Sequence, residues 1–403
     1  MSTAIETQLL HTQPASPEKP PRLESIDLLR GAVIAIMAID HVRDYISSSA
    51  GVFDPTDLSR TSAGLFLTRW ITHFCAPIFV FLAGIGSYLA TQRGRSGAEV
   101  SWFLLSRGAW LVLLEIFVIT PFGWSFQADL SFVRLQVIWV IGISMILLSA
   151  LNRLPASLVG GIGLAMIVSH NLLDGSTQTV WRLLHGISFH QLAPGHRVAS
   201  LYPLIPWAGV LMAGFGAGQL WTWDARSRRI WLYRSAGVGL GLFVALRMAN
   251  GYGDPSPWSG QASALFTVFS FLNVSKYPPS LDYLLLTLSM GAWALARLEA
   301  VRAGLGSALL IFGRVPLFFY LLHLPLIHGI AVVLSYWQYG DASWLLQDPF
   351  ALRRGPHPAP AGYGYDLPVV YLVWVVVMAI LYPLCRAYGK FKSRQRHPAW
   401  SYL

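Results

Sequence analysis

Charged residues are scarce in this chain. Asp, Glu, Lys and Arg make up 12% of its 403 residues, which is about half the share found in soluble domains. Hydrophobic residues make up 54%, and the mean hydropathy is +0.51. This composition predicts a polytopic membrane protein. The net charge of +10 comes mostly from arginines in short loops, as expected for a membrane topology, so it does not indicate a nucleic-acid partner.

Cysteine is nearly absent, and so are two widespread catalytic motifs. The two cysteines, Cys75 and Cys385, both lie inside apolar runs, so neither a disulfide nor a cysteine-bound metal is expected. The chain contains no Gly-rich phosphate loop of the Walker type and no Gly-x-Ser-x-Gly nucleophile elbow. These absences disfavour P-loop nucleotide chemistry and serine-hydrolase chemistry.

Long apolar runs are abundant instead. Ten have the length of a membrane span, at residues 26–46, 65–91, 102–121, 132–151, 155–172, 203–222, 231–249, 279–299, 305–337 and 367–388. The ninth is too long for a straight crossing and contains Pro316 and Pro325, which predicts a kink or a break. Residues 262–272 are apolar but short, and they favour a re-entrant or interfacial segment over a further span. The predicted fold class is therefore all-α, a transmembrane helix bundle of about ten spans.

Loop charge predicts the orientation of this bundle. Loops after the even-numbered spans are short and basic, and they contain Arg93, Arg95, Arg153, Arg226, Arg228, Arg229, Arg234, Arg297 and Arg302. Because cytoplasmic loops are enriched in Lys and Arg, both termini are predicted to be cytoplasmic. Residues 1–21 are polar and rich in proline, which predicts a disordered tail rather than a cleaved signal peptide. Residues 22–388 form the predicted transmembrane domain, and residues 389–403 a basic tail.

The first span is unusual because it contains several ionisable residues, namely Asp27, Arg30, Asp40, His41, Arg43 and Asp44. Ionisable groups are costly in hydrocarbon, so several on one span indicate a functional site. Arg30 and His41 are eleven residues apart, which places them on one helix face with about 16 Å between them. We expect both side chains to line one continuous cavity.

Two histidines near the predicted outer surface are candidates for catalysis. Asp40 and Asp44 flank His41, and a carboxylate beside an imidazole can fix its tautomer and raise its basicity. His41 is therefore a candidate base, with Asp40 or Asp44 as its partner. His73 in the second span can reach the same cluster, either to carry an acyl group or to shape the site. The alternative is structural: these residues anchor a helix end, and His73 bonds a carbonyl freed by Pro77.

The ninth span contains His323 and His328, which point about 140° apart around the helix. A zinc pair on one helix would favour a spacing of four residues, and no carboxylate accompanies them, so no metal site is expected here. Tyr320 and His323 can line a cavity beside the kink. Arg314 lies toward the cytoplasmic end, where it can meet an anionic ligand or extend to lipid headgroups.

Two further features have simpler interpretations. Gly214 and Gly218 form a small-xxx-small face, which favours close packing against another helix. Lys276 is the only lysine near the predicted outer face, so it is a candidate for contact with a substrate.

Several of these segments resemble a known family. They are Ser25–Gly31 with Met37–His41, Phe79–Gly84, Pro203–Gly209 and Gly313–His323. The chain resembles the bacterial heparan-α-glucosaminide N-acetyltransferase-like family from about residue 22 to residue 388. The spacing of Arg30 and His41 is also similar to the Arg-x10-His arrangement of the broader transmembrane acyltransferase superfamily. The resemblance implies a helical membrane protein that takes acetyl-CoA from the cytoplasm and acetylates a sugar on the other side.

The leading hypothesis is an acetyl-CoA-dependent N- or O-acyltransferase of the bacterial inner membrane that acts on a sugar or glycan. Acetyl transfer needs a base or a transient acetyl carrier, roles that suit His41 or His73. Arg30, Arg314 and His323 are the candidate contacts for acetyl-CoA. The rival hypothesis is a multi-pass transporter or flippase without covalent chemistry, and a membrane scaffold is the third. No metal is expected, and a homodimer is left open.

Overall fold

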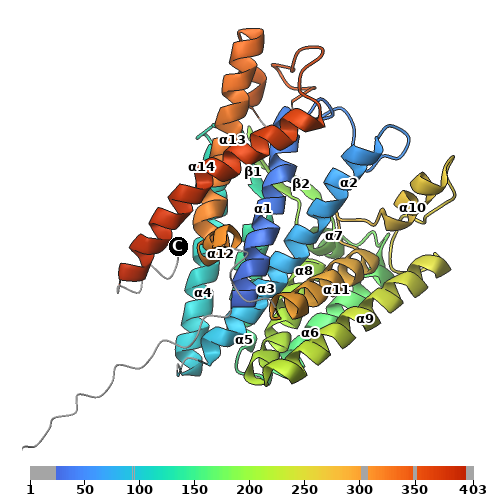
Figure 1. Ribbon diagram of the computed structural model, residues 1–403, viewed down its shortest axis with the longest axis vertical. Helices are drawn as coiled ribbons and strands as arrows, with labels where there is room; N and C mark the ends of the chain where they lie inside the picture. Colours follow the sequence, from blue (N-terminus) through green and yellow to red (C-terminus); the bar gives the residue numbers. More distant parts are fainter. Residues whose placement is uncertain (1–23, 93, 95, 301–306, 348–351, 396–403) are drawn as a thin grey trace, which may run out of the picture.

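Helices make up most of the molecule (Figure 1). The computed structural model describes residues 24–92, 94, 96–300, 307–347 and 352–395. The predicted tail of residues 1–21, three of the predicted cytoplasmic arginines, Arg93, Arg95 and Arg302, and the last part of the predicted basic tail lie outside the described residues.

Within the described residues, seven helical segments are long and apolar enough to cross a membrane. They contain α2 (Ala63–Ile71) with α3 (Cys75–Thr91), α4 (Gly97–Leu114) with the π-helix η2 (Glu115–Ser125), α6 (Ala156–Ser169) with η3 (His170–Leu173), α8 (Leu204–Ala217) with η4 (Gly218–Thr222), α11 (Leu281–Leu298), α13 (Pro316–Tyr339) and α14 (Leu367–Arg394). The chain is therefore a mainly helical, multi-pass membrane protein, as predicted. The count of ten spans and the cytoplasmic termini stay predictions.

The other predicted spans also fall on helices. One is α5 (Val137–Leu151), which is apolar but shorter. Two more, α1 (Glu24–Ile46) and α9 (Ala225–Ala249), have spanning length but carry several charged residues. The ninth predicted span is broken, as expected, because α12 (Ser307–Arg314) ends just before α13 begins at Pro316. Residues 262–272 contain only the nine-residue helix α10 (Ala264–Leu272), which is about 14 Å long and too short to span a bilayer.

Helix α1 lies at the centre of the bundle, where it contacts α3, α11, α12, α13 and α14 (Figure 1). Its tightest approach is to α12, where a Cβ added at Gly31 would overlap the carbonyl oxygen of Leu309, and one at Gly313 would overlap that of Asp27. The predicted small-residue face of α8 also packs closely, because a Cβ at Gly214 would overlap the carbonyl oxygen of Phe81 in α3. These glycines allow helix backbones to touch.

A small sheet interrupts the helices and corrects the all-α prediction in one place. It contains β1 (Phe132–Leu135), β2 (Ser188–Ala193) and β3 (His196–Ser200) in the order β1-β3-β2. Strand β3 pairs in parallel with β1 and antiparallel with β2. The fourth predicted span was therefore wrong at its start, because residues 132–135 form β1 and α5 begins only at Val137. The apolar residues of β1 run directly into α5, so hydropathy alone does not separate them.

Three shorter helical segments complete the described structure. Helix α7 (Thr179–His185) precedes β2, and the single turn η5 (Ser343–Leu345) follows α13. The 3-10 turn η1 (Thr72–Phe74) joins α2 to α3. Helix α14 continues to Arg394, so the first residues of the predicted basic tail are helical.

Candidate functional site: a polar cavity at the end of α1

A cavity of about 640 Å³ lies at the C-terminal end of α1. Its lining comes from separate parts of the chain: the end of α1, the following loop at 49–55, the α2–α3 junction, Trp124, residues 134–137 and the 187–202 hairpin, with residues 276–277, Tyr320 and residues 353–354. Asp40, His41 and Asp44 are all in this lining, and so is Lys276, the lysine that sequence analysis suggested as a substrate contact.

Asp40 is the centre of a buried charge network in the cavity. Its Oδ1 accepts a hydrogen bond of 2.8 Å from Arg43, and its Oδ2 accepts one of 2.7 Å from Arg69. The Lys276 ammonium lies 3.9 Å from the same Oδ2. Asp40 thus neutralises cations from three segments of the chain, and it makes no hydrogen bond to His41 among the contacts described. This arrangement joins α1, α2 and the segment before α11.

His41 lies beside this network with a different set of neighbours. Its Nδ1 is 4.0 Å from Oδ2 of Asp44, and this buried nitrogen has no hydrogen-bond partner among the described residues. Its ring meets Trp124 edge-on, with 5.2 Å between ring centroids. Of the two carboxylates predicted to orient His41, Asp44 is therefore the nearer. The ring combines an unpaired nitrogen with access to the cavity, as a base or a nucleophile requires.

The ring of His323 packs against the ring of His41, with 5.2 Å between the two centroids. Its Nδ1 is 2.7 Å from the carbonyl oxygen of Tyr320, which leaves the buried Nε2 without a partner among the described residues. The proton therefore belongs on Nδ1, and Nε2 is a free acceptor. His328 differs, because both of its nitrogens contact carbonyl oxygens, those of Gly123 and Leu345. His328 is thus a structural residue.

The π-helix η2 supplies a wall of the cavity that sequence analysis missed. Trp124 lies near its end, and the Arg134 guanidinium sits 4.6 Å above the Trp124 ring. Tyr45 donates hydrogen bonds of 3.0 Å to the carbonyl oxygens of Gly123 and Trp124, which fixes η2 against α1. π-Helical turns occur frequently at functional sites. The signal in the sequence was Pro121, which removes a helical hydrogen bond.

The Tyr277 phenol, in the loop region of the cavity, has a shifted pKa. Burial opposes ionisation of the Tyr277 phenol, but Lys276 and Arg69 outweigh it and lower the pKa of Tyr277. The same cations thus favour negative charge both at Asp40 and at the neighbouring phenol. An anionic or electron-rich ligand group would gain from this field.

The remaining predicted site residues lie away from the cavity lining. Arg30 binds Oδ1 of Asp27 at 3.0 Å and the carbonyl oxygen of Gly313 at 3.3 Å, at the other end of α1. The expectation that Arg30 and His41 line one cavity was wrong for this cavity, because Arg30 is not part of its lining. Arg314 is exposed and lies 3.5 Å from Glu24. His73 is buried beside Tyr283, and Arg69, one turn earlier, reaches the network in its place.

Comparison with known protein families gave one match. The model of the family described as "Heparan-alpha-glucosaminide N-acetyltransferase, catalytic" matches residues 22–244, which is more than half of the chain. The matched part runs from α1 into α9 and contains Asp40, His41, Asp44 and Arg69, whereas Lys276, Tyr320 and His323 follow it. A comparison with curated proteins found no match.

Proposed function

The chain belongs to the family of the heparan-α-glucosaminide N-acetyltransferase catalytic domain, which indicates a membrane acetyltransferase, and from this premise we propose its reaction. The protein moves an acetyl group from cytoplasmic acetyl-CoA to an amine or hydroxyl of a sugar or glycan outside the cytoplasm. The observation that carries the proposal is the position of His41, which lines the cavity with an unpaired ring nitrogen beside Asp44 and His323.

His41 is the proposed base or acetyl carrier of this reaction. In direct transfer, the imidazole takes the proton of the acceptor amine or hydroxyl while that atom attacks the thioester carbonyl. The carbon–sulfur bond then breaks, and the leaving thiolate takes the proton from the imidazolium, which gives free CoA and the acetylated sugar. In the two-step route, the imidazole attacks the thioester carbonyl, the carbon–sulfur bond breaks, and CoA leaves as the thiol with the imidazole proton. The acceptor then attacks the acetyl-imidazole, the carbon–nitrogen bond breaks, and the acceptor's proton returns to the ring. His73, which is buried outside the lining, is the second candidate for the carrier.

The other predicted residues have supporting roles in the proposal. Asp44 is the carboxylate near Nδ1 of His41, and Asp40 places Arg43, Arg69 and Lys276 around the cavity. The sequence suggests His323 as a contact for acetyl-CoA, but its ring contact with His41 favours a role in positioning the His41 ring.

The donor end of the proposal uses the opposite end of α1. Arg314 is partly exposed there and suits the phosphates of CoA, and Arg30 anchors α12 beside it. Eleven residues separate Arg30 from His41, about 16 Å along α1. The part of CoA between its nucleotide and its thioester is long and flexible, which suits a site where the nucleotide and the acetyl group bind this far apart.

The test is acetyl transfer by purified protein in detergent. Release of free CoA thiol is followed with acetyl-CoA and a glucosamine acceptor, and the acetylated sugar is identified by mass spectrometry. His41→Ala should lower the rate by about 10²–10⁴-fold, the usual cost of losing a general base. The matched control is His190→Ala, which removes an exposed histidine of β2 that is outside the cavity lining.

Three outcomes of this test would change the proposal. A rate in His41→Ala close to that of the wild type would refute the role of His41. Equal losses in His41→Ala and His73→Ala would favour an acetyl carrier at His73 with His41 as its base. If the wild-type protein neither transfers acetyl groups nor releases CoA, but moves a labelled sugar across liposomes, the transporter hypothesis replaces the proposal.

A further inference from the structure

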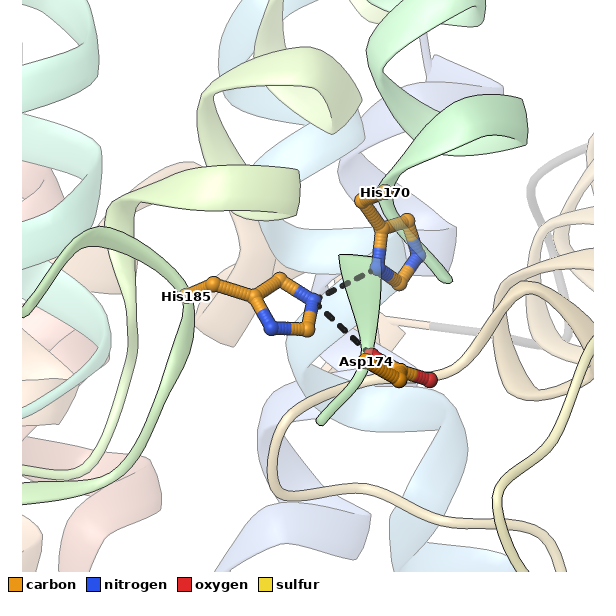
Figure 2. A group of neighbouring side chains, drawn as sticks. All are labelled: His170, Asp174 and His185. Carbon is orange, nitrogen blue, oxygen red and sulfur yellow. Dashed lines mark hydrogen bonds and ion pairs between the residues drawn. The ribbon is translucent and has the colours of Figure 1, made fainter. Parts of the chain in front are cut away.

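A second cluster of polar side chains lies at the end of α6, and none of its members lines the cavity. Figure 2 shows its three residues converging from separate segments: His170 begins η3, Asp174 follows η3, and His185 ends α7. Nδ1 of His170 is 2.8 Å from Nε2 of His185, which is 3.7 Å from Oδ1 of Asp174. None of these residues is among the candidates predicted from the sequence.

We propose that this cluster binds one zinc ion, which ties α7 to the end of α6. Two imidazole nitrogens and one carboxylate oxygen are ligands that Zn²⁺ commonly takes, and three protein ligands leave the fourth position to water. Both histidines are buried, with 2% and 5% of their surfaces exposed, while the Asp174 side chain is 28% exposed. The site is thus enclosed on the protein side and open to solvent at the carboxylate.

The observed distances are close to those that zinc requires. Bonds of about 2.0–2.1 Å in a tetrahedral site place neighbouring ligand atoms about 3.3 Å apart. The two histidine nitrogens, now 2.8 Å apart, would separate by about 0.5 Å, and the 3.7 Å gap to Asp174 would close by about 0.4 Å. The three ligand atoms all lie within 4.8 Å of one another. The third pair, His170 and Asp174, lies within the same 4.8 Å and would likewise have to settle at about 3.3 Å.

The facing nitrogens of His170 and His185 are held together by one shared proton, because only one of two neutral imidazoles in contact can donate. Nε2 of His170 lies on the other side of its ring and would carry the ring proton when Nδ1 binds a metal. A zinc ion would bind both facing lone pairs at once and would thereby replace the shared proton.

Neighbouring groups already hold two ligands in the orientation that binding needs. Asn171 donates a hydrogen bond of 2.6 Å to Oδ2 of Asp174, which leaves Oδ1 directed toward His185. The Trp181 ring stacks on His185 with 4.7 Å between centroids and 16° between planes. Such outer contacts orient the ligands of metal sites.

The position of the site suggests what the metal does. His185 is followed by Gly186 and then by Ile187, and both Ile187 and Phe189 line the cavity. A metal bond at His185 would therefore fix the start of β2 and with it this wall of the cavity. The role is structural, and it does not depend on which reaction the cavity performs.

The first test measures zinc in the full-length protein, purified in detergent without a histidine tag. After dialysis against micromolar Zn²⁺, the wild type should hold one zinc ion per chain, and competition with a coloured chelator should give its affinity. His170→Ala, His185→Ala and Asp174→Asn should each bind zinc at least about tenfold more weakly, since even outer contacts are worth about 10–100-fold. His190→Ala removes an exposed histidine close by in the chain and should bind as the wild type does.

The second test measures thermal unfolding with and without zinc. Free zinc a hundredfold above its dissociation constant should raise the melting temperature of the wild type by about 5 °C. Without zinc, Asp174→Asn should melt at the temperature of the metal-free wild type, and the same zinc concentration should raise its melting temperature by no more than about half as much, which separates weakened binding from misfolding. Failure of the wild type to bind stoichiometric zinc would overturn the proposal, as would equal affinity in the His170→Ala/His185→Ala double variant.

Discussion

Asp40→Asn removes the carboxylate that three cations share in the cavity. The substitution keeps the size and shape of the side chain but replaces the negative charge with a neutral amide. Arg43 retains a hydrogen bond of 2.7 Å to Asp44. Arg69 is affected more, since its contact of 3.3 Å with the Thr72 hydroxyl is neutral. The change therefore leaves the Arg69 guanidinium, whose side chain is only 10% exposed, without an ionic partner at Asp40.

The expected cost follows from the burial of this pair. Removing one partner from a buried ion pair costs about 3–5 kcal/mol, because the other charge stays buried and uncompensated. The network borders a cavity that water can enter, so the lower end, about 3 kcal/mol, is the appropriate figure. In a chain of this size, a loss of 1 kcal/mol lowers the melting temperature by about 2 °C, so Asp40→Asn should melt about 6 °C below the wild type.

The assay is thermal unfolding in detergent, followed by tryptophan fluorescence. Asp44→Asn is the matched control, because it removes a carboxylate one turn further along α1 that also binds Arg43. The Asp44 side chain is 41% exposed, so solvent screens its charge and the expected loss is at most about 1 kcal/mol. Adding Arg69→Met to Asp40→Asn should recover part of the stability, since the double variant buries no unpaired guanidinium.

Two results would refute this reasoning. One is a melting temperature for Asp40→Asn that equals that of Asp44→Asn, which would mean that the network adds no more than an exposed pair. The other is a double variant that melts lower than Asp40→Asn, which would mean that Arg69 stabilises the fold through contacts other than its charge.

Two further predictions concern helix packing and topology. Gly84→Ala should destabilise the protein by about 1–3 kcal/mol, because its Cβ would overlap the carbonyl oxygen of Leu211, whereas Gly86→Ala in the same helix meets open space and should be neutral or slightly stabilising. Equal melting temperatures for the two variants would contradict the close contact between α3 and α8. A reporter enzyme that works only in the cytoplasm should be active when it is fused after Arg229, and a reporter that works only outside the cytoplasm should be inactive there. Activity of the external reporter would reverse the predicted orientation.

The sequence alone was enough to predict the helical elements and several of the important residues. Apolar runs depend only on local composition, so the predicted spans fall on helices apart from residues 132–135, and the break near Pro316 is present. The interpretation of Gly214 as a packing position is confirmed, because close approach of helices needs a residue without a Cβ. His41 and Lys276 both line the cavity, as ionisable groups in apolar surroundings are expected to mark a site.

Only the tertiary structure decided which of these groups meet. Asp40 binds Arg69 rather than His41, and His323 reaches His41 from a helix far along the chain. Helix rotation and packing set such pairings, and hydropathy does not encode them. The same holds for the three proposed zinc ligands, His170, Asp174 and His185. They meet only because the segment around η3 lies beside the end of α7. Local sequence thus specified the elements, whereas long-range contacts between elements specified the chemistry.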